Sequence, residues 1–226
     1  MLHRRDLRVR VSAGVLTAQR RHALERRIRC IVTATIAYNL VEAIVAITAG
    51  TIASSGALIG FGLDSAIEVL SAAAVAWQFT RRDPQRWERP VLRVIAVAFF
   101  ALAAYVTVTS ALTLFARVEV EHSPAGIVIT ALSVAIMPFL SFAERRAGRE
   151  LGSATAVADS KQTLICTYLS AAVLIGLVAN SVLGWWWADA VAGLVIAVFA
   201  VREGREAWRG DACATSVGML LEDEHS

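Results

Sequence analysis

The chain has 226 residues, of which 57% are hydrophobic and only 18% charged, and its apolar residues come in long blocks. This composition excludes an ordinary soluble globular domain, in which apolar residues form shorter amphipathic stripes. The net charge of +3 is explained by membrane topology and attraction to anionic lipid, so it does not support a nucleic-acid partner.

Six apolar blocks approach or reach the roughly 20 residues that a helix needs to cross about 30 Å of hydrocarbon. In chain order they cover residues 30–52, 57–79, 91–115, 125–142, 163–183 and 185–201. The blocks predict an all-α polytopic membrane protein with six transmembrane helices. We expect a basic arm at residues 1–29, a six-helix transmembrane domain at 30–209 and a cytoplasmic tail at 210–226.

Positive charge alternates between the connections. Arginines crowd the N-terminal arm, residues 81–89, residues 145–161 and the segment after residue 201, whereas the other connections carry few. Because short cytoplasmic loops retain Lys and Arg, we predict a multi-pass protein of the cell membrane with both termini in the cytoplasm.

Two acidic residues interrupt the second block. Asp64 and Glu68 are four residues apart, so their side chains share one helical face. Helical rise places them roughly 22 and 16 Å from the cytoplasmic end. An acid near the bilayer centre costs at least about 2.5 kcal/mol on insertion scales, so the pair needs a metal ion or protons to neutralise it.

A second polar face precedes and enters the fifth block. Asp159, Gln162 and Cys166 follow helical spacing, and a helix that begins near residue 154 places Cys166 roughly 18 Å deep, level with the acidic pair. Carboxylate, amide and thiolate ligands suit a divalent ion with tetrahedral preference, zinc first. These side chains also have structural interpretations. Asp64 and Glu68 could be protonated or bonded to Ser and Thr of neighbouring helices, Gln162 could form a hydrogen bond between helices, and Cys166 could be apolar packing. Asp159 could pair with Lys161 or complement a helix N-terminus.

The first and sixth blocks carry further acids. Glu42 lies near the midplane with Asn39 one turn before it, and this pair could carry protons, support the site or form interhelical hydrogen bonds. Asp189 follows a row of tryptophans, where we expect it to complement a helix N-terminus. All four histidines lie outside the blocks, so we expect no histidine in the site.

At these residues the chain resembles the transmembrane domain of the cation diffusion facilitator family of metal exporters. The similar stretches are residues 38–43, 62–68, 158–166 and 186–190, and the resemblance covers about residues 30–209. It implies a six-helix fold, a homodimer and metal export coupled to proton uptake. The family's second-helix ligands correspond to Asp64 and Glu68, and its fifth-helix His and Asp correspond to Gln162 and Cys166. We expect the family's usual cytoplasmic C-terminal domain to be absent.

The sequence therefore predicts a transporter that exports a divalent metal ion, zinc first, in exchange for protons, with Asp64 or Glu68 alternating between metal-bound and protonated states. It is not expected to be an enzyme. Two alternatives stay open: a proton-coupled exporter of organic cations, and a non-transporting membrane partner or regulatory subunit.

Overall fold

The computed structural model describes residues 18–79, 84–116, 120–151 and 154–209, except for some side chains near helix ends. They form six helices: α1 (Ala18–Ala53), α2 (Gly56–Phe79), α3 (Pro84–Ala116), α4 (Pro124–Leu151), α5 (Ala154–Leu183) and α6 (Ala188–Arg209). The predicted all-α fold with six helices is confirmed. Most of the predicted basic arm and the whole predicted tail lie outside the described residues, while residues 18–29 continue α1 as helix.

Within the described residues, five helices, α1 to α5, are long and apolar enough to cross a membrane. α6 is the exception because Asp189 and the charged residues from Arg202 onward lie near its two ends. The sixth block was predicted at 185–201, but its helix begins only at Ala188. Gly184 adopts a φ of +66°, which favours glycine, and the rings of Trp185 and Trp187 stack in the turn that follows.

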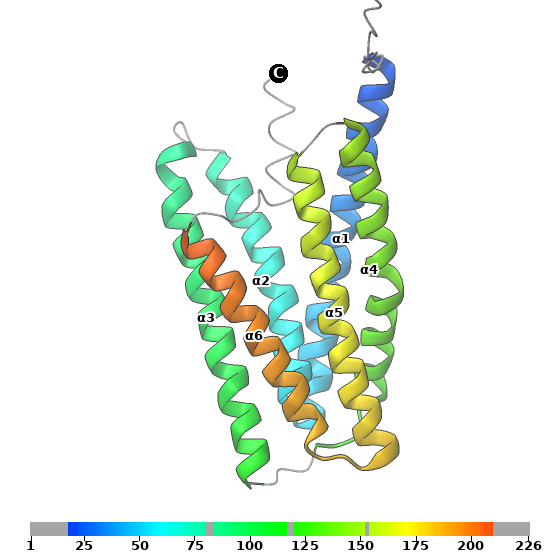
Figure 1. The fold of residues 1–226 in the computed structure, drawn as a ribbon, viewed down its shortest axis with the longest axis vertical. Helices are drawn as coiled ribbons and strands as arrows, with labels where there is room; N and C mark the ends of the chain where they lie inside the picture. Colours follow the sequence, from blue (N-terminus) through cyan, green and yellow to red (C-terminus); the bar gives the residue numbers. More distant parts are fainter. Residues whose placement is uncertain (1–17, 80–83, 117–119, 152–153, 210–226) are drawn as a thin grey trace, which may run out of the picture.

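The helices pack most extensively in pairs, α4 with α5, α3 with α6 and α1 with α2 (Figure 1). Leu58 and Phe61 of α2 are fully buried against Val106 of α3, Val173 of α5 and Ile196 of α6. This apolar contact joins the pair formed by α3 and α6 to the rest of the bundle.

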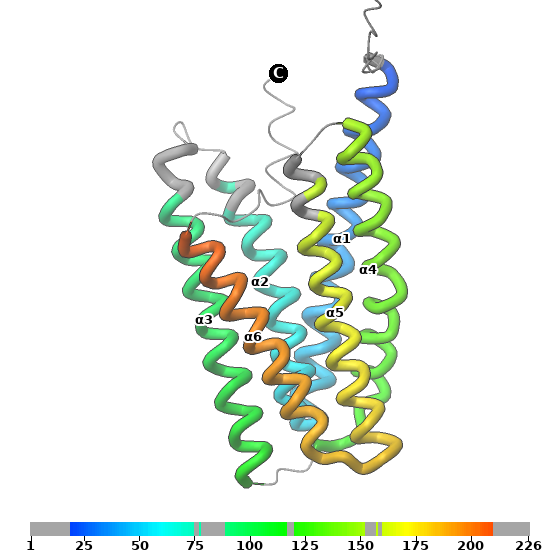
Figure 2. The backbone as a smooth tube through the Cα atoms, viewed as in Figure 1, coloured from blue at the N-terminus to red at the C-terminus, as the bar shows by residue number. Residues whose placement is uncertain are grey.

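The arginine-rich ends of the helices gather at one end of the bundle. Figure 2 shows the start of α1 beside the end of α4, where Arg20 forms an ion pair with Glu150 at 2.6 Å. The connections from α1 to α2, from α3 to α4 and from α5 to α6 lie at the opposite end. The arrangement matches the alternation of charge along the chain.

The helices α1 and α2 approach each other closely at Gly62. A Cβ atom on this residue would lie 2.7 Å from Cγ1 of Ile47 and 2.9 Å from its backbone nitrogen. Only glycine fits between the two backbones without displacing one of them. The close approach brings the polar face of α1 within reach of the acidic face of α2.

Candidate metal centre

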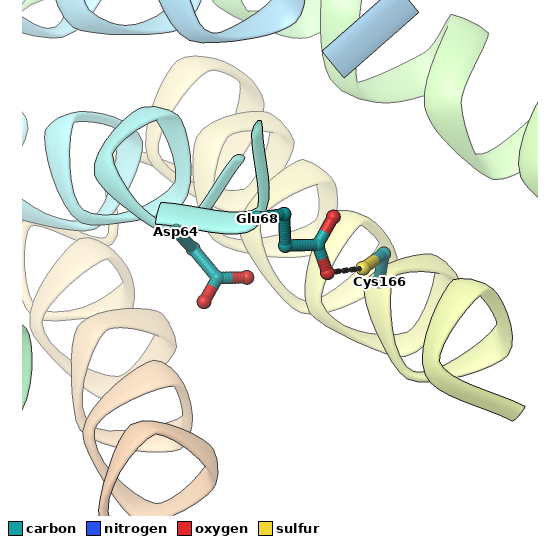
Figure 3. Close-up of side chains that lie close together, drawn as sticks. All are labelled: Asp64, Glu68 and Cys166. Atoms are coloured by element: carbon teal, nitrogen blue, oxygen red, sulfur yellow. Dashed lines mark hydrogen bonds between the residues drawn. The ribbon is translucent and has the colours of Figure 1, made fainter. Parts of the chain in front are cut away.

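The acidic pair of α2 faces the cysteine of α5. One oxygen of Asp64, one oxygen of Glu68 and Sγ of Cys166 all lie within 4.8 Å of one another. Figure 3 shows the carboxylates projecting from neighbouring turns of α2, with the Cys166 thiol donating a hydrogen bond to Oε1 of Glu68 at 2.7 Å. Asp64 and Cys166 are buried, and Glu68 is partly buried. The spacing along α2 and α5 thus brings together the three residues that the sequence places at one depth.

Two amides also contact Glu68. The side-chain amide of Asn39 in α1 donates to Oε2 at 2.6 Å, and that of Gln162 in α5 donates to Oε1 at 3.4 Å. Glu68 is therefore the centre of a polar cluster with contributions from three helices. Asp159 lies on α5, but its side chain lies outside the described part, so its predicted role stays a prediction.

Glu42 belongs to a neighbouring hydrogen-bond network. It is 1% exposed, and its carboxylate accepts hydrogen bonds from Ser65 of α2, at 2.6 Å, and from Ser133 of α4. The hydroxyl of Tyr38 contacts that of Ser133 at 2.7 Å. Of the alternatives for Glu42, the structure contains the interhelical hydrogen bonds, and these join α1, α2 and α4 beside the candidate site.

Asp189 has the structural role expected of it, but for a different helix. It lies in the first turn of α6, yet its carboxylate accepts hydrogen bonds from the hydroxyl of Ser55 and from the backbone N–H of Ala57 at 3.3 Å. Ser55 in turn accepts the backbone N–H of Leu58 at 3.0 Å. Asp189 and Ser55 together satisfy donors at the N-terminus of α2, which would otherwise be buried without partners.

Sequence reasoning did not single out Glu203 of α6. This side chain is partly buried, and, like Glu68 and Glu42, it lies close enough to Asp64 for the two carboxylates to repel each other when both are ionised. Glu203 stands among several charged residues near the end of α6, so the sequence alone does not distinguish it from an exposed residue. Its neighbours Arg202 and Glu206 do form an exposed ion pair, at 3.2 Å. Ser65 and Ser133 were also missed, since a serine in an apolar helix carries little signal alone.

No histidine of the described segments lies at the centre. His22 contacts Glu25 at 3.2 Å near the start of α1, and His122 is exposed just before α4. The cluster therefore offers two carboxylates, one thiol and two amides. Oxygen and thiolate ligands in this combination can hold a divalent ion of borderline softness, and the ion would also neutralise the two carboxylates in an apolar surrounding.

Residues 32–209 match the family described as the cation efflux transmembrane domain. The chain belongs to this family. Its membership confirms the resemblance to the cation diffusion facilitators that the motifs indicate, and it makes the chain a multi-pass membrane protein of a transporter family rather than an enzyme.

The chain is also similar to the cation-efflux pump FieF of Shewanella oneidensis. This relative is 31% identical to this chain over 105 residues, which make up 46% of this chain and 33% of the relative. The match thus spans about a third of the relative's length. Membership of the cation efflux family therefore rests on the longer match over residues 32–209.

Proposed function

We propose that this protein exports a divalent metal cation from the cytoplasm, zinc or a similar ion, in exchange for protons, through the site between α2 and α5. The observation that carries the proposal is the cluster of Asp64, Glu68 and Cys166, whose ligand atoms lie within 4.8 Å of one another in a chain of the cation efflux family. The relative FieF is named a cation-efflux pump, which supports outward transport.

The chemistry of the cluster favours a borderline ion. Zinc takes carboxylate and thiolate ligands in tetrahedral sites, whereas a site built only from oxygen atoms suits magnesium, calcium or manganese. Cys166 supplies the soft sulfur ligand, whereas the amides of Asn39 and Gln162 that contact Glu68 offer only oxygen and nitrogen atoms. Cadmium, cobalt and iron fit the same set of ligands.

Proton exchange follows from charge balance. Metal ligands bind in their deprotonated form, so binding an ion releases protons and releasing the ion allows carboxylates to take them up. Asp64 and Glu68 would alternate in this way between the ion and protons. Glu42, which is buried in the neighbouring hydrogen-bond network with Ser65 and Ser133, would support the pair or carry a proton towards it.

Further parts of the proposal concern the assembly. We place the arginine-rich end of the bundle, including both termini, in the cytoplasm because positive residues are retained there. We place the chain in the cell membrane as a homodimer, as the family resemblance implies. Asp159 would receive ions at the cytoplasmic end of α5.

Transport by purified protein in liposomes tests the proposal. With an acidic interior, the wild-type protein should accumulate zinc, and a protonophore should abolish the uptake. Asp64→Asn and Glu68→Gln should stop uptake without loss of folded protein. The matched control is Glu25→Gln, because Glu25 is a buried glutamate that pairs with Arg21 at 2.9 Å, away from the site.

Other outcomes would support the two alternatives. Uptake of a hydrophobic amine that survives chelation of metal would indicate an organic-cation exporter. Failure to move either substrate, together with a normal cellular phenotype of the Asn and Gln variants, would indicate a regulatory membrane partner. Zinc uptake that is equal in the wild-type protein and both variants would place the site elsewhere.

A further inference from the structure

The first helix contributes a side chain to the cluster between α2 and α5. Asn39 of α1 is 4% exposed, and its amide nitrogen lies 2.6 Å from Oε2 of Glu68. By comparison, the amide of the partly buried Gln162 is 3.4 Å from Oε1 of the same carboxylate. Asn39 is thus the amide that approaches Glu68 more closely.

The amide oxygen of Asn39 has no hydrogen-bond donor among the described residues, although it is buried. A buried carbonyl oxygen without a partner is energetically unfavourable. The oxygen and nitrogen of one amide group share a carbon atom, so this unpartnered oxygen lies beside the cluster of Glu68, Asp64 and Cys166. A cation held in the cluster would supply the missing partner once the amide group turns its oxygen towards it.

The count of ligands leads to the same residue. Asp64, Glu68 and Cys166 offer three ligand atoms, whereas zinc prefers four and harder ions prefer six or more. An amide oxygen is an established ligand type for hard cations and an acceptable one for borderline ions. An ion bound to these three atoms would therefore have a coordination position left for an oxygen ligand from α1.

We propose that Asn39 is a direct ligand of the transported cation and sets how hard an ion the site accepts. The inference rests on the proposed transport of a divalent metal. Without an ion, the N–H of Asn39 donates to Glu68, as the structure shows. With an ion, a half-turn of the amide group presents its oxygen, so that α1, α2 and α5 all hold the cation.

The proposal can be separated from a purely structural role of Asn39. Removal of an oxygen ligand should weaken hard ions more than soft ones, and addition of a carboxylate should strengthen hard ions more. A residue that only orients Glu68 would change the affinity of all divalent ions by one common factor. The ratio of manganese to cadmium affinity therefore distinguishes the two roles.

The test is competition binding of zinc, cadmium and manganese to detergent-purified wild-type protein, Asn39→Leu and Asn39→Asp. For Asn39→Leu we expect about tenfold weaker zinc binding and a fall in the ratio of manganese to cadmium affinity. For Asn39→Asp we expect that ratio to rise about tenfold. Because a ratio does not depend on the fraction of folded protein, partial misfolding of a variant leaves the test valid.

Asn180 provides the matched control. It is a similarly buried asparagine of α5, 6% exposed, whose amide donates to the backbone oxygen of Val120 at 2.8 Å, far along the helix from Cys166. Asn180→Leu and Asn180→Asp should leave all three affinities unchanged. Equal shifts for all three ions in the Asn39 variants, or no shifts, would overturn the proposal.

The same measurement separates this inference from the proposed function. Loss of zinc binding in Asp64→Asn together with wild-type affinities in both Asn39 variants would overturn the role of Asn39 alone. Absence of metal binding in the wild-type protein would overturn both.

Discussion

Asp64→Asn is the substitution that most directly separates metal binding from folding. Asp64 is 7% exposed, accepts no hydrogen bond from the described residues and has a carboxylate oxygen within 4.8 Å of one of Glu68. An asparagine keeps the shape and removes the charge. In the absence of metal we expect the variant to be at least as stable as the wild-type protein, because one source of repulsion among buried acids is lost.

The effect on metal binding has the opposite sign. Removal of one partner of a buried charged pair costs about 3–5 kcal/mol, which corresponds to at least about 100-fold weaker binding. At a zinc concentration of about 100 times the wild-type Kd, the ion should stabilise the wild-type protein by about 2.7 kcal/mol. The same concentration is about equal to the Kd of Asp64→Asn, so the variant should gain only about 0.4 kcal/mol.

Thermal unfolding in detergent, with and without zinc, measures both effects. We expect a large rise in the Tm of the wild-type protein on addition of zinc and a small rise for Asp64→Asn, with the metal-free Tm of the variant equal or higher. The control Glu25→Gln should respond to zinc like the wild-type protein, since Glu25 is buried near the start of α1, away from the cluster of Asp64, Glu68 and Cys166. Equal stabilisation of Asp64→Asn and wild type by zinc would refute the assignment of Asp64 as a ligand.

Three further outcomes are expected. Reporter fusions at residue 85 and at the C-terminus should give cytoplasmic signals, since arginine-rich connections stay in the cytoplasm, and an external signal at either place would contradict the six-span topology. Cys166→Ser should lose zinc and cadmium preferentially, and Cys166→Asp should shift preference towards manganese; equal losses for all ions in competition binding would remove the thiol from the ligands. Asp189→Ala should lower the free energy of unfolding by about 1–3 kcal/mol, because Ser55 and the N–H of Ala57 lose their buried acceptor; an unchanged denaturation midpoint would show that the contact contributes little.

The sequence predicts the spacing and the depth of residues along a single helix. The spacing of Asp64 and Glu68 determines that they share a face, and a fifth helix that begins at Ala154 places Cys166 at the same depth. The structure agrees, because the three ligand atoms lie within 4.8 Å of one another. Helical rise and periodicity are nearly constant, so these relations follow without knowledge of the neighbouring helices.

Contacts between helices could not be predicted in the same way. The approach of Asn39 to Glu68 depends on how α1 is rotated and how closely it packs on α2, which Gly62 and Ile47 decide. The capping of α2 by Asp189 depends on the path of two turns at one end of the bundle. Helix ends also differ from the apolar blocks, because charged residues such as Arg145 and Glu150 continue α4 as good helix formers beyond the apolar stretch.

The packing of the bundle gives the polar residues a role in positioning the site. The helices α2 and α5 carry the candidate ligands, yet they pack much less on each other than α2 does on α1 or α5 on α4. The distance between the ligands therefore depends on contacts that link the helix pair α1 and α2 to the helix pair α4 and α5. Glu42 is such a link, since it joins α1 and α2 to Ser133 of α4. A cation bound by Glu68 and Cys166 would be a second link, so binding of the ion and the packing of the two pairs should stabilise each other.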